Sequence, residues 1–198
     1  MIKIYGGKMG SSFRAHWMLA EAGVEYETAP VDMAAREHKG EAFLKLNPMG
    51  QVPVMVDGEF VLTESMAINE YVAAKYAPAF LGSTPEQKAD AWRWSLWAYL
   101  NVQKHFGAMA YQALWAPEKN EEAFAKDAEA VKPYLAILDA HLAGKEYLLG
   151  KDFSTADINA GVAVMYGVMV AYDFSSYPNV AAWIDRLKSR PAFQKASA

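Results

Sequence analysis

The sequence of 198 residues lacks cysteine entirely. It therefore cannot form a disulfide, bind a metal through thiolates, or use a cysteine nucleophile or a Cys-x-x-Cys redox centre of its own. A chain without cysteine also suits a reducing compartment, and we expect a cytoplasmic protein. Its first residues, Met1–Lys8, contain no continuous apolar stretch, so a secretory signal is not expected.

Long apolar runs and basic runs are also missing. The longest nearly unbroken apolar run, Ala160–Ala171, is too short to span a bilayer. The chain has 19 Lys and Arg against 23 Asp and Glu, a formal net charge of −4. Because binding to nucleic acid without sequence preference depends on cationic side chains that neutralise phosphates, we expect neither nucleic acid nor membrane as a partner.

Apolar and aromatic side chains are abundant. Hydrophobic residues make up 53% of the chain and aromatic residues 13%, which excludes a disordered polypeptide. The length allows one large domain or two small ones. The histidines His16, His105 and His141 are not spaced as ligands on one helix face, so no metal site is expected.

Residues 1–77 alternate between β-favouring and helix-periodic segments, in the order β-α-β-α-β-β-α. The β-rich runs 52–56 and 59–62, joined by Asp57 and Gly58, predict a tight hairpin. Ser11 or Ser12 can cap the first helix. The pattern predicts a small sheet with helices on its faces.

Residues 78–85 form the best linker in the chain, and no convincing strand follows them. Capping-box patterns at Thr84–Gln87 and Ser154–Asp157 each open a helix. Further helices are predicted over 120–142, 155–172 and 178–189, with a short one from 191. The region 86–198 is therefore predicted to be all-helical.

The first long helix of this region carries Trp92, Trp94 and Trp97. Helical geometry cannot turn all three side chains inward, so some of them should be exposed or lie at an interface.

Two motifs at the hairpin carry a family resemblance. The motif Asn47–Pro53, which ends in Gln-Val-Pro, and the motif Leu62–Ile68, which contains Glu-Ser, resemble the glutathione-binding half of a glutathione S-transferase. The segments Asp152–Asp157 and Tyr177–Phe193 resemble that superfamily's helical domain. The resemblance covers nearly the whole chain, is of a bacterial type and assigns no class. It implies a thioredoxin-like N-terminal domain (1–77), a linker (78–85) and an all-helical C-terminal bundle (86–198).

The resemblance also implies the roles of individual residues in glutathione binding. Pro53 would be cis, so that the Val52 backbone pairs with the cysteinyl backbone of glutathione. Glu64 and Ser65, at a helix start, would bind the ammonium and the carboxylate of the γ-glutamyl group. The complete set of glutathione-binding residues implied is His38, Lys39, Gln51, Val52, Pro53, Glu64 and Ser65.

The chemistry implied by the resemblance needs glutathione as its thiolate. A thiol with a pKa near 8.5 is only about 3% ionised at neutral pH. One charge-assisted hydrogen bond stabilises a charge by roughly 1.5–3 kcal/mol, so a single hydroxyl at the first helix is enough. Matching through Arg14 places Met9 or Gly10 where the serine-using classes have their serine, so the usual serine is displaced. Ser11 is the nearest hydroxyl and matches the count from the N-terminus in the beta class, and Ser12 is the next candidate. Matching through Trp17 and the helix end instead favours Tyr5, and these alternatives stay open.

The resemblance therefore implies a cytoplasmic homodimeric transferase of detoxification type. Glutathione would be its co-substrate, no metal would take part, and glutathione would be conjugated to a small hydrophobic electrophile. The loop Met9–Gly10 and the helices around 99–115 would line the electrophile pocket. Two alternatives remain: a non-enzymatic binding or regulatory protein of the same fold, and a glutathione-dependent isomerase.

Overall fold

A computed structural model describes residues 1–198, which divide into two compact units. Unit 1 comprises residues 1–78 and 191–198, and unit 2 comprises residues 79–190. Residues 191–198 thus belong to unit 1, whereas the expected helical domain 86–198 included them. Aromatic packing explains the difference, because the ring of Phe193 meets Phe13 and Trp17 edge-on at centroid distances of 5.1 and 5.0 Å.

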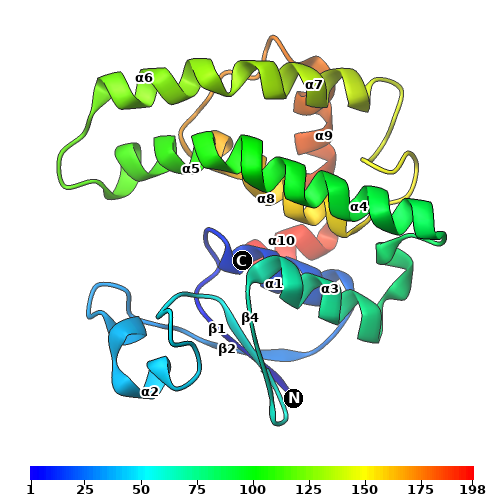
Figure 1. Ribbon diagram of the computed structural model, residues 1–198. Helices are drawn as coiled ribbons and strands as arrows, with labels where there is room; N and C mark the ends of the chain where they lie inside the picture. Colours follow the sequence, from blue (N-terminus) through cyan, green and yellow to red (C-terminus); the bar gives the residue numbers. More distant parts are fainter. The chain divides into compact units, whose positions relative to one another are not determined.

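Unit 1 contains one four-stranded sheet. Its strands are β1 (Ile2–Tyr5), β2 (Tyr26–Ala29), β3 (Val54–Asp57) and β4 (Phe60–Thr63), in the order β2-β1-β3-β4 (Figure 1). Strand β2 is parallel to β1, whereas β3 is antiparallel to β1 and to β4. The parallel pair is joined through α1 (Ser12–Glu21), as a β-α-β connection requires. The predicted thioredoxin-like architecture is confirmed.

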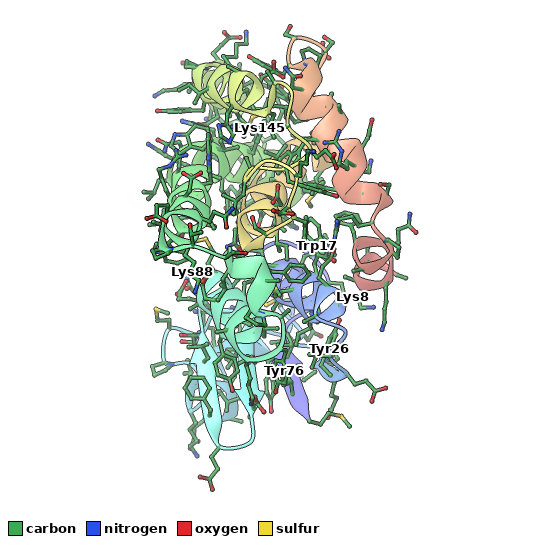
Figure 2. The ribbon with its side chains drawn as sticks, turned by 90° about the vertical axis from the view of Figure 1, so that its right-hand side faces the viewer. Lys8, Trp17, Tyr26, Tyr76, Lys88 and Lys145 are labelled. Carbon is green, nitrogen blue, oxygen red and sulfur yellow. The ribbon has the colours of Figure 1, made fainter.

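Helices cover the two faces of this sheet. Ile2 and Ile4 are buried and point to one face, where α1 packs against α3 (Ser65–Tyr76) and α10 (Pro191–Ser197). Because side chains alternate along a strand, Tyr5 points to the other face. There it meets Phe43 of α2 (Glu41–Leu44), which follows the short 3₁₀-helix η1 (Glu37–Lys39). Figure 2 shows Trp17 on the side of α1 that faces α10.

The hairpin forms as predicted, but its turn is shifted by one residue. Asp57 pairs with Phe60, so the two-residue loop consists of Gly58 and Glu59 rather than Asp57 and Gly58. Gly58 has φ +63, which suits glycine. The carboxylate of Asp57 accepts hydrogen bonds from the Tyr71 hydroxyl at 2.8 Å and from Lys75, and these contacts keep Asp57 within the strand.

The regular elements of unit 2 are all helices, and one isolated β-bridge joins Tyr147 and Gly150. A 3₁₀-helix, η2 (Pro78–Leu81), replaces the first part of the expected linker. A long helical stretch then includes two π-helical segments. The elements of this unit after η2 are α4 (Pro85–Trp97), η3 (Ala98–Gln103), α5 (Lys104–Ala110), η4 (Tyr111–Trp115), α6 (Glu121–Ala130), α7 (Lys132–Leu142), α8 (Thr155–Met169) and α9 (Pro178–Ser189).

Two predicted helix boundaries in unit 2 are wrong. The helix expected over 120–142 is divided at Val131, because Pro133 has no N–H to continue the ladder and instead lies in the first turn of α7. The helix expected over 155–172 ends at Met169, just before Ala171 adopts φ +55. As predicted, the tryptophans of α4 do not all point inward: Trp94 is buried, while Trp92 is 39% exposed.

None of the helices combines the length and the apolar character that a membrane crossing needs.

Candidate functional site

The centre of the site is the turn that leads into β3. The peptide bond between Val52 and Pro53 is cis, as predicted, and Pro53 is buried. The buried side chain of Asn47 shapes this turn, because its Nδ2 donates to the Gln51 carbonyl at 2.8 Å and its Oδ1 accepts from the Met49 N–H at 3.1 Å. The side chain of Gln51 is exposed at the start of the turn.

Residues His38 and Lys39 of η1 lie against the same turn. The Lys39 ammonium donates to the carbonyls of Met49 and Gly50 at 3.1 and 2.9 Å. Gly50 has φ +59, and a Cβ at this position would lie 2.7 Å from the His38 carbonyl, so only glycine fits. The Nδ1 atom of His38 is buried without a hydrogen-bond partner. The structure therefore brings η1 and the cis turn together.

A second part of the site is the N-terminus of α3. Glu64 precedes the helix with φ +66 and ψ 111, a strained conformation for a residue with a side chain, and it is exposed. The side chain of Ser65 is buried, and its Oγ accepts a hydrogen bond of 3.3 Å from Nη1 of Arg14. Because Arg14 is only 1% exposed, it places a permanent positive charge beside the free N–H groups of the helix start.

The hydroxyl of Ser11 joins this site to the cis turn. Its Oγ lies 3.3 Å from the Val52 carbonyl oxygen, to which it donates, and the side chain is half-buried. Ser11 is the N-terminal flanking residue of α1 but makes no capping bond with its side chain. The hydroxyl therefore remains directed at the backbone that precedes the cis proline.

The two alternative hydroxyls lie elsewhere. Ser12 is 2% exposed and packs against Gly6, where an added Cβ would lie 2.6 Å from the Ser12 Oγ. The ring of Tyr5 lies on the α2 face of the sheet, edge-on to Phe43 at 6.4 Å. Of the three candidates, the structure joins only Ser11 to Val52 by a hydrogen bond.

The sequence did not reveal two supporting residues. In the sequence, Arg14 only helps to align the chain with the family, and Asn47 is only the first residue of a motif. In the structure both are buried and hold the site together. Arg14 reaches Ser65 across 51 positions of sequence, so no local pattern could predict that contact. The Asn-Pro pair at 47–48 is a typical turn signal and could have indicated the Asn47 side-chain bonds.

These elements suit an extended, peptide-like ligand that carries a carboxylate. The Val52 N–H makes no hydrogen bond within the chain, and its carbonyl retains a lone pair beside the Ser11 contact. A ligand backbone could pair with both groups as a neighbouring strand does. The helix start with Arg14 favours an anionic group, and a hydroxyl donor lies next to the paired backbone.

Comparison with known proteins identifies two family models in the chain. They are the glutathione S-transferase N-terminal domain, matched over residues 2–74, and the glutathione S-transferase C-terminal domain, matched over residues 99–191. Glutathione S-transferase 3 of Zea mays is 35% identical over 212 residues, which cover 100% of this chain and 93% of that protein. Glutathione S-transferase F9 of Arabidopsis thaliana is 33% identical, with coverage of 100% and 97%.

Solved structures show the same similarity in three dimensions. The theta class glutathione S-transferase from the citrus canker pathogen Xanthomonas axonopodis pv. citri, with glutathione bound, superposes with a TM-score of 0.92 at 33% identity. That match covers 99% of this chain and 96% of the other. Glutathione S-transferase-I, bound with lactoylglutathione, has a TM-score of 0.91 at 31% identity, covering 99% and 98% of the two chains.

Proposed function

The chain belongs to the glutathione S-transferase family and is a glutathione-conjugating transferase, and from that premise we propose which of its residues bind glutathione and activate the thiol. The observation that supports the proposal best is the hydrogen bond from Ser11 to the Val52 carbonyl, next to the cis peptide bond. It places a hydroxyl donor beside the backbone to which a peptide ligand can pair.

Val52 and Gln51 receive the peptide part of glutathione. The cysteinyl residue of glutathione pairs through its backbone with the N–H and C=O of Val52, which the cis Pro53 presents just before the start of β3. The exposed Gln51 side chain lies next to this pairing. In this arrangement the cysteinyl side chain leaves the paired backbone on the side of Ser11.

Ser65 and Glu64 bind the γ-glutamyl end. The carboxylate accepts hydrogen bonds at the start of α3, where the Ser65 hydroxyl, the free N–H groups and the Arg14 charge favour an anion. The exposed carboxylate of Glu64 pairs with the ammonium. Each hydrogen bond to a charged group is worth about 1.5–3 kcal/mol, so this end supplies much of the affinity.

His38 and Lys39 bind the glycyl carboxylate. Lys39 keeps its positive charge while it donates to two carbonyls of the turn. The buried Nδ1 of His38 lacks a partner in the free chain, and leaving such an atom unsatisfied costs about 1–3 kcal/mol. A carboxylate that accepts a hydrogen bond from Nδ1–H of His38 recovers that loss.

Ser11 activates the thiol: when glutathione binds, its single hydroxyl hydrogen turns from the Val52 carbonyl to the sulfur, and this hydrogen bond stabilises the thiolate. The hydroxyl is not itself the nucleophile, so no base beside it is needed. A bond worth about 1.5–3 kcal/mol lowers the pKa of the thiol by roughly one to two units, since one unit corresponds to about 1.4 kcal/mol. The thiol proton passes to water, the thiolate attacks an electrophilic carbon, and the leaving group departs with the bonding electron pair.

The electrophile is small and hydrophobic. Unit 2 exposes aromatic side chains along its long helical stretch: Tyr99 is 45% exposed, Tyr111 50% and Trp115 49%. Tyr99 belongs to η3 and the other two to η4, and π-helical segments frequently occur at functional sites. Such rings provide apolar contact area with few polar groups, which suits a planar apolar substrate.

The protein acts as a homodimer. Trp92, Leu96 and Leu100 are 39%, 37% and 60% exposed and follow one another at four-residue spacing along α4 and η3. An apolar stripe of this kind on a helix is typical of a surface that a partner covers. A second copy of the chain is the partner that we propose.

Calorimetric titration with glutathione, followed by turnover with a panel of aryl halides, epoxides and activated alkenes, tests the proposed function. We expect saturable binding of glutathione and conjugation of at least one electrophile. Binding without conjugation, together with an unshifted thiol pKa in the complex, would support the binding-protein alternative. Absence of binding would show that the site is misassigned.

A further inference from the structure

His16 is a fully buried polar residue in a helix segment whose neighbours are apolar. It is 0% exposed, and Ala15, Trp17, Met18 and Leu19 around it in α1 are equally buried. An imidazole in such surroundings destabilises the fold unless both of its nitrogens are satisfied. Both are: Nε2 lies 3.1 Å from the Gly6 carbonyl oxygen, and Nδ1 lies 3.2 Å from the Tyr26 hydroxyl.

These partners fix the protonation of the ring. A carbonyl oxygen only accepts, so Nε2 carries the hydrogen and donates to Gly6. Nδ1 is then the acceptor, and the Tyr26 hydroxyl donates to it. Burial lowers the pKa of His16, and the Lys8 ammonium lowers it further, while hydrogen bonds with the backbone of Gly6 and Gly7 oppose the shift. Figure 2 labels Tyr26, whose hydroxyl bonds to the ring, and Lys8, whose charge acts on it.

The Gly6 carbonyl is the point where β1 ends and the loop to Ser11 begins. The Gly6 N–H donates to the Ala29 carbonyl of β2 at 3.0 Å, and the His16 bond holds the opposite side of the same residue. Gly6 has φ +128, a conformation that is open to glycine and costly for other residues. A Cβ on Gly6 would also lie 3.1 Å from the Val52 Cβ, so Gly6 fits closely against the residue that Ser11 contacts.

The loop that follows cannot hold itself in place. Gly7, Lys8 and Met9 are exposed, and three of the five residues from Gly6 to Gly10 are glycine. The segment therefore has little side-chain packing of its own. Ser11 comes directly after it. The direction of the Ser11 hydroxyl therefore depends on how the loop is anchored at its start, and that anchor is the pair of bonds on Gly6.

We propose that His16 is a positioning residue for catalysis: by donating from Nε2 to the Gly6 carbonyl, it fixes the Gly6–Gly10 loop and so directs the Ser11 hydroxyl at the glutathione thiol. Tyr26 supports it by holding the ring in the tautomer that donates to Gly6. This inference rests on the role proposed for Ser11. His16 itself touches neither substrate.

The test replaces His16 with leucine, which removes the donor, and with glutamine, whose amide can still donate toward Gly6. Conjugation of a chlorodinitrobenzene is measured together with the pKa of the bound thiol and the unfolding midpoint. In His16→Leu we expect kcat to fall on the order of tenfold, because misplacing a catalytic group by a fraction of an ångström has effects of this size. The KM for glutathione should change less than about twofold, since the binding residues are untouched. His16→Gln should restore most of kcat.

A matched control comes from His141 of unit 2, whose Nε2 also donates to a backbone carbonyl, that of Leu148, at 2.8 Å. His141→Leu should lower the unfolding midpoint and leave kcat and the bound-thiol pKa unchanged. If His16→Leu behaves in the same way, its role is only structural and the inference is wrong. Should His16→Leu not fold, Tyr26→Phe takes its place, with a smaller loss of kcat expected and an unchanged kcat contradicting the inference.

Ser11→Ala separates failure of this inference from failure of the proposed function. If Ser11→Ala leaves the bound-thiol pKa unchanged, the assignment of Ser11 fails. If Ser11→Ala raises that pKa but His16→Leu does not, only the role of His16 fails. When both assignments are correct, adding His16→Leu to Ser11→Ala should lower kcat no further, because the two residues act through one hydroxyl.

Discussion

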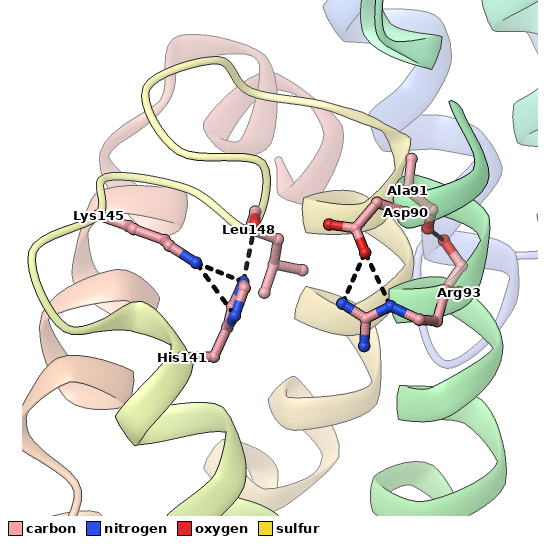
Figure 3. A network of polar contacts seen from close by, with 7 residues as sticks. Asp90, Ala91, Arg93, His141, Lys145 and Leu148 are labelled. Atoms are coloured by element: carbon pink, nitrogen blue, oxygen red, sulfur yellow. Dashed lines mark hydrogen bonds and ion pairs between the residues drawn. The ribbon is translucent and has the colours of Figure 1, made fainter. Parts of the chain in front are cut away.

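The backbone N–H of Leu148 donates a hydrogen bond of 2.9 Å to the fully buried carboxylate of Asp157. The carbonyl of Leu148 in turn accepts a hydrogen bond from Nε2 of His141 at 2.8 Å (Figure 3). Asp157 also accepts from the Ser154 N–H and hydroxyl and from Nε1 of Trp183, each at 3.0 Å. One carboxylate thus joins the loop before α8, the first turn of α8 and α9.

Replacing Asp157 with alanine should lower the stability of the chain more than the loss of a helix cap does. A cap is worth about 0.5–2 kcal/mol, but here four buried donors lose their acceptor, and we expect roughly 3 kcal/mol or more. Chemical denaturation measures the effect. Glutathione affinity per folded molecule should stay the same, and a loss of catalysis at unchanged stability would contradict a structural role.

Asp157 and His141, which both bond to Leu148, should change the free energy of unfolding in opposite directions as pH rises. Burial raises the pKa of Asp157 to about 6, so its contribution is fully present below the unfolded pKa of about 3.9 and is lost as pH rises through about 6. Burial lowers the pKa of His141, so its contribution is present above about 6.5 and is lost as pH falls through its folded pKa.

Variants separate these two effects. In His141→Gln, the free energy of unfolding should rise by about 2–3 kcal/mol relative to the Asp157→Asn, His141→Gln double variant when pH falls from 7 to 4. Urea titrations at several pH values provide the measurement. Parallel pH profiles of the single and the double variant would show that Asp157 does not titrate in this range.

Glu64→Gln and Ser65→Ala should each weaken glutathione binding by about 1–3 kcal/mol, because each removes a contact to a charged group of the γ-glutamyl end. Calorimetric titration gives the affinities. Ser154→Ala is the matched control, since it removes a buried serine at a helix start of unit 2, and its glutathione affinity should equal that of the parent. The site is misassigned if both unit 1 variants bind glutathione as the parent does.

Ser11→Ala should raise the pKa of bound glutathione by about one unit or more toward its free value, because the donor to sulfur is lost. Ultraviolet absorbance of the thiolate against pH measures it. Tyr5→Phe should leave the titration unchanged, since the Tyr5 ring packs on Phe43, and Ser12→Ala controls for the loss of a neighbouring hydroxyl. A shift in Tyr5→Phe alone would transfer the role to Tyr5.

Leu96→Lys should convert the dimer to a monomer, because it places a charge in the apolar stripe of Trp92, Leu96 and Leu100. Sedimentation velocity measures the change. Ile137→Lys alters an equally apolar residue of α7 that is 50% exposed and lies outside the stripe, and this variant should stay dimeric. A dimeric Leu96→Lys variant would place the interface elsewhere.

Local patterns in the sequence predicted the elements, the family resemblance implied the cis turn, and the predictions failed where distant residues decide. Periodicity predicted the sheet, and the resemblance carried by the Gln-Val-Pro motif implied the cis Pro53, which the structure has. The turn of the hairpin was misplaced by one residue because Tyr71 and Lys75, beyond β4, hold Asp57. The helix break at Val131 does have a local signal, because Pro133 lies two residues after it.

In the candidate site, too, the sequence predicts some features while others depend on contacts between distant residues. Its motif residues could be identified in the sequence, but which of Tyr5, Ser11 and Ser12 lies against Val52 could not, because the Ser11 contact spans 41 positions. The contact between Arg14 and Ser65 and that between His16 and Gly6 likewise depend on the fold. Pairs of this kind leave no periodicity or spacing in the sequence.

The position of α10 determines when unit 1 can finish folding during synthesis of the chain. Unit 1 is discontinuous, since its last helix is separated from the rest by all of unit 2. On the ribosome, the rings of Phe13 and Trp17 are synthesised early but wait for Phe193 until all of unit 2 has been made. Unit 1 is therefore begun before unit 2 but completed after it, and a chain that ends at Arg190 leaves α1 without its aromatic cover.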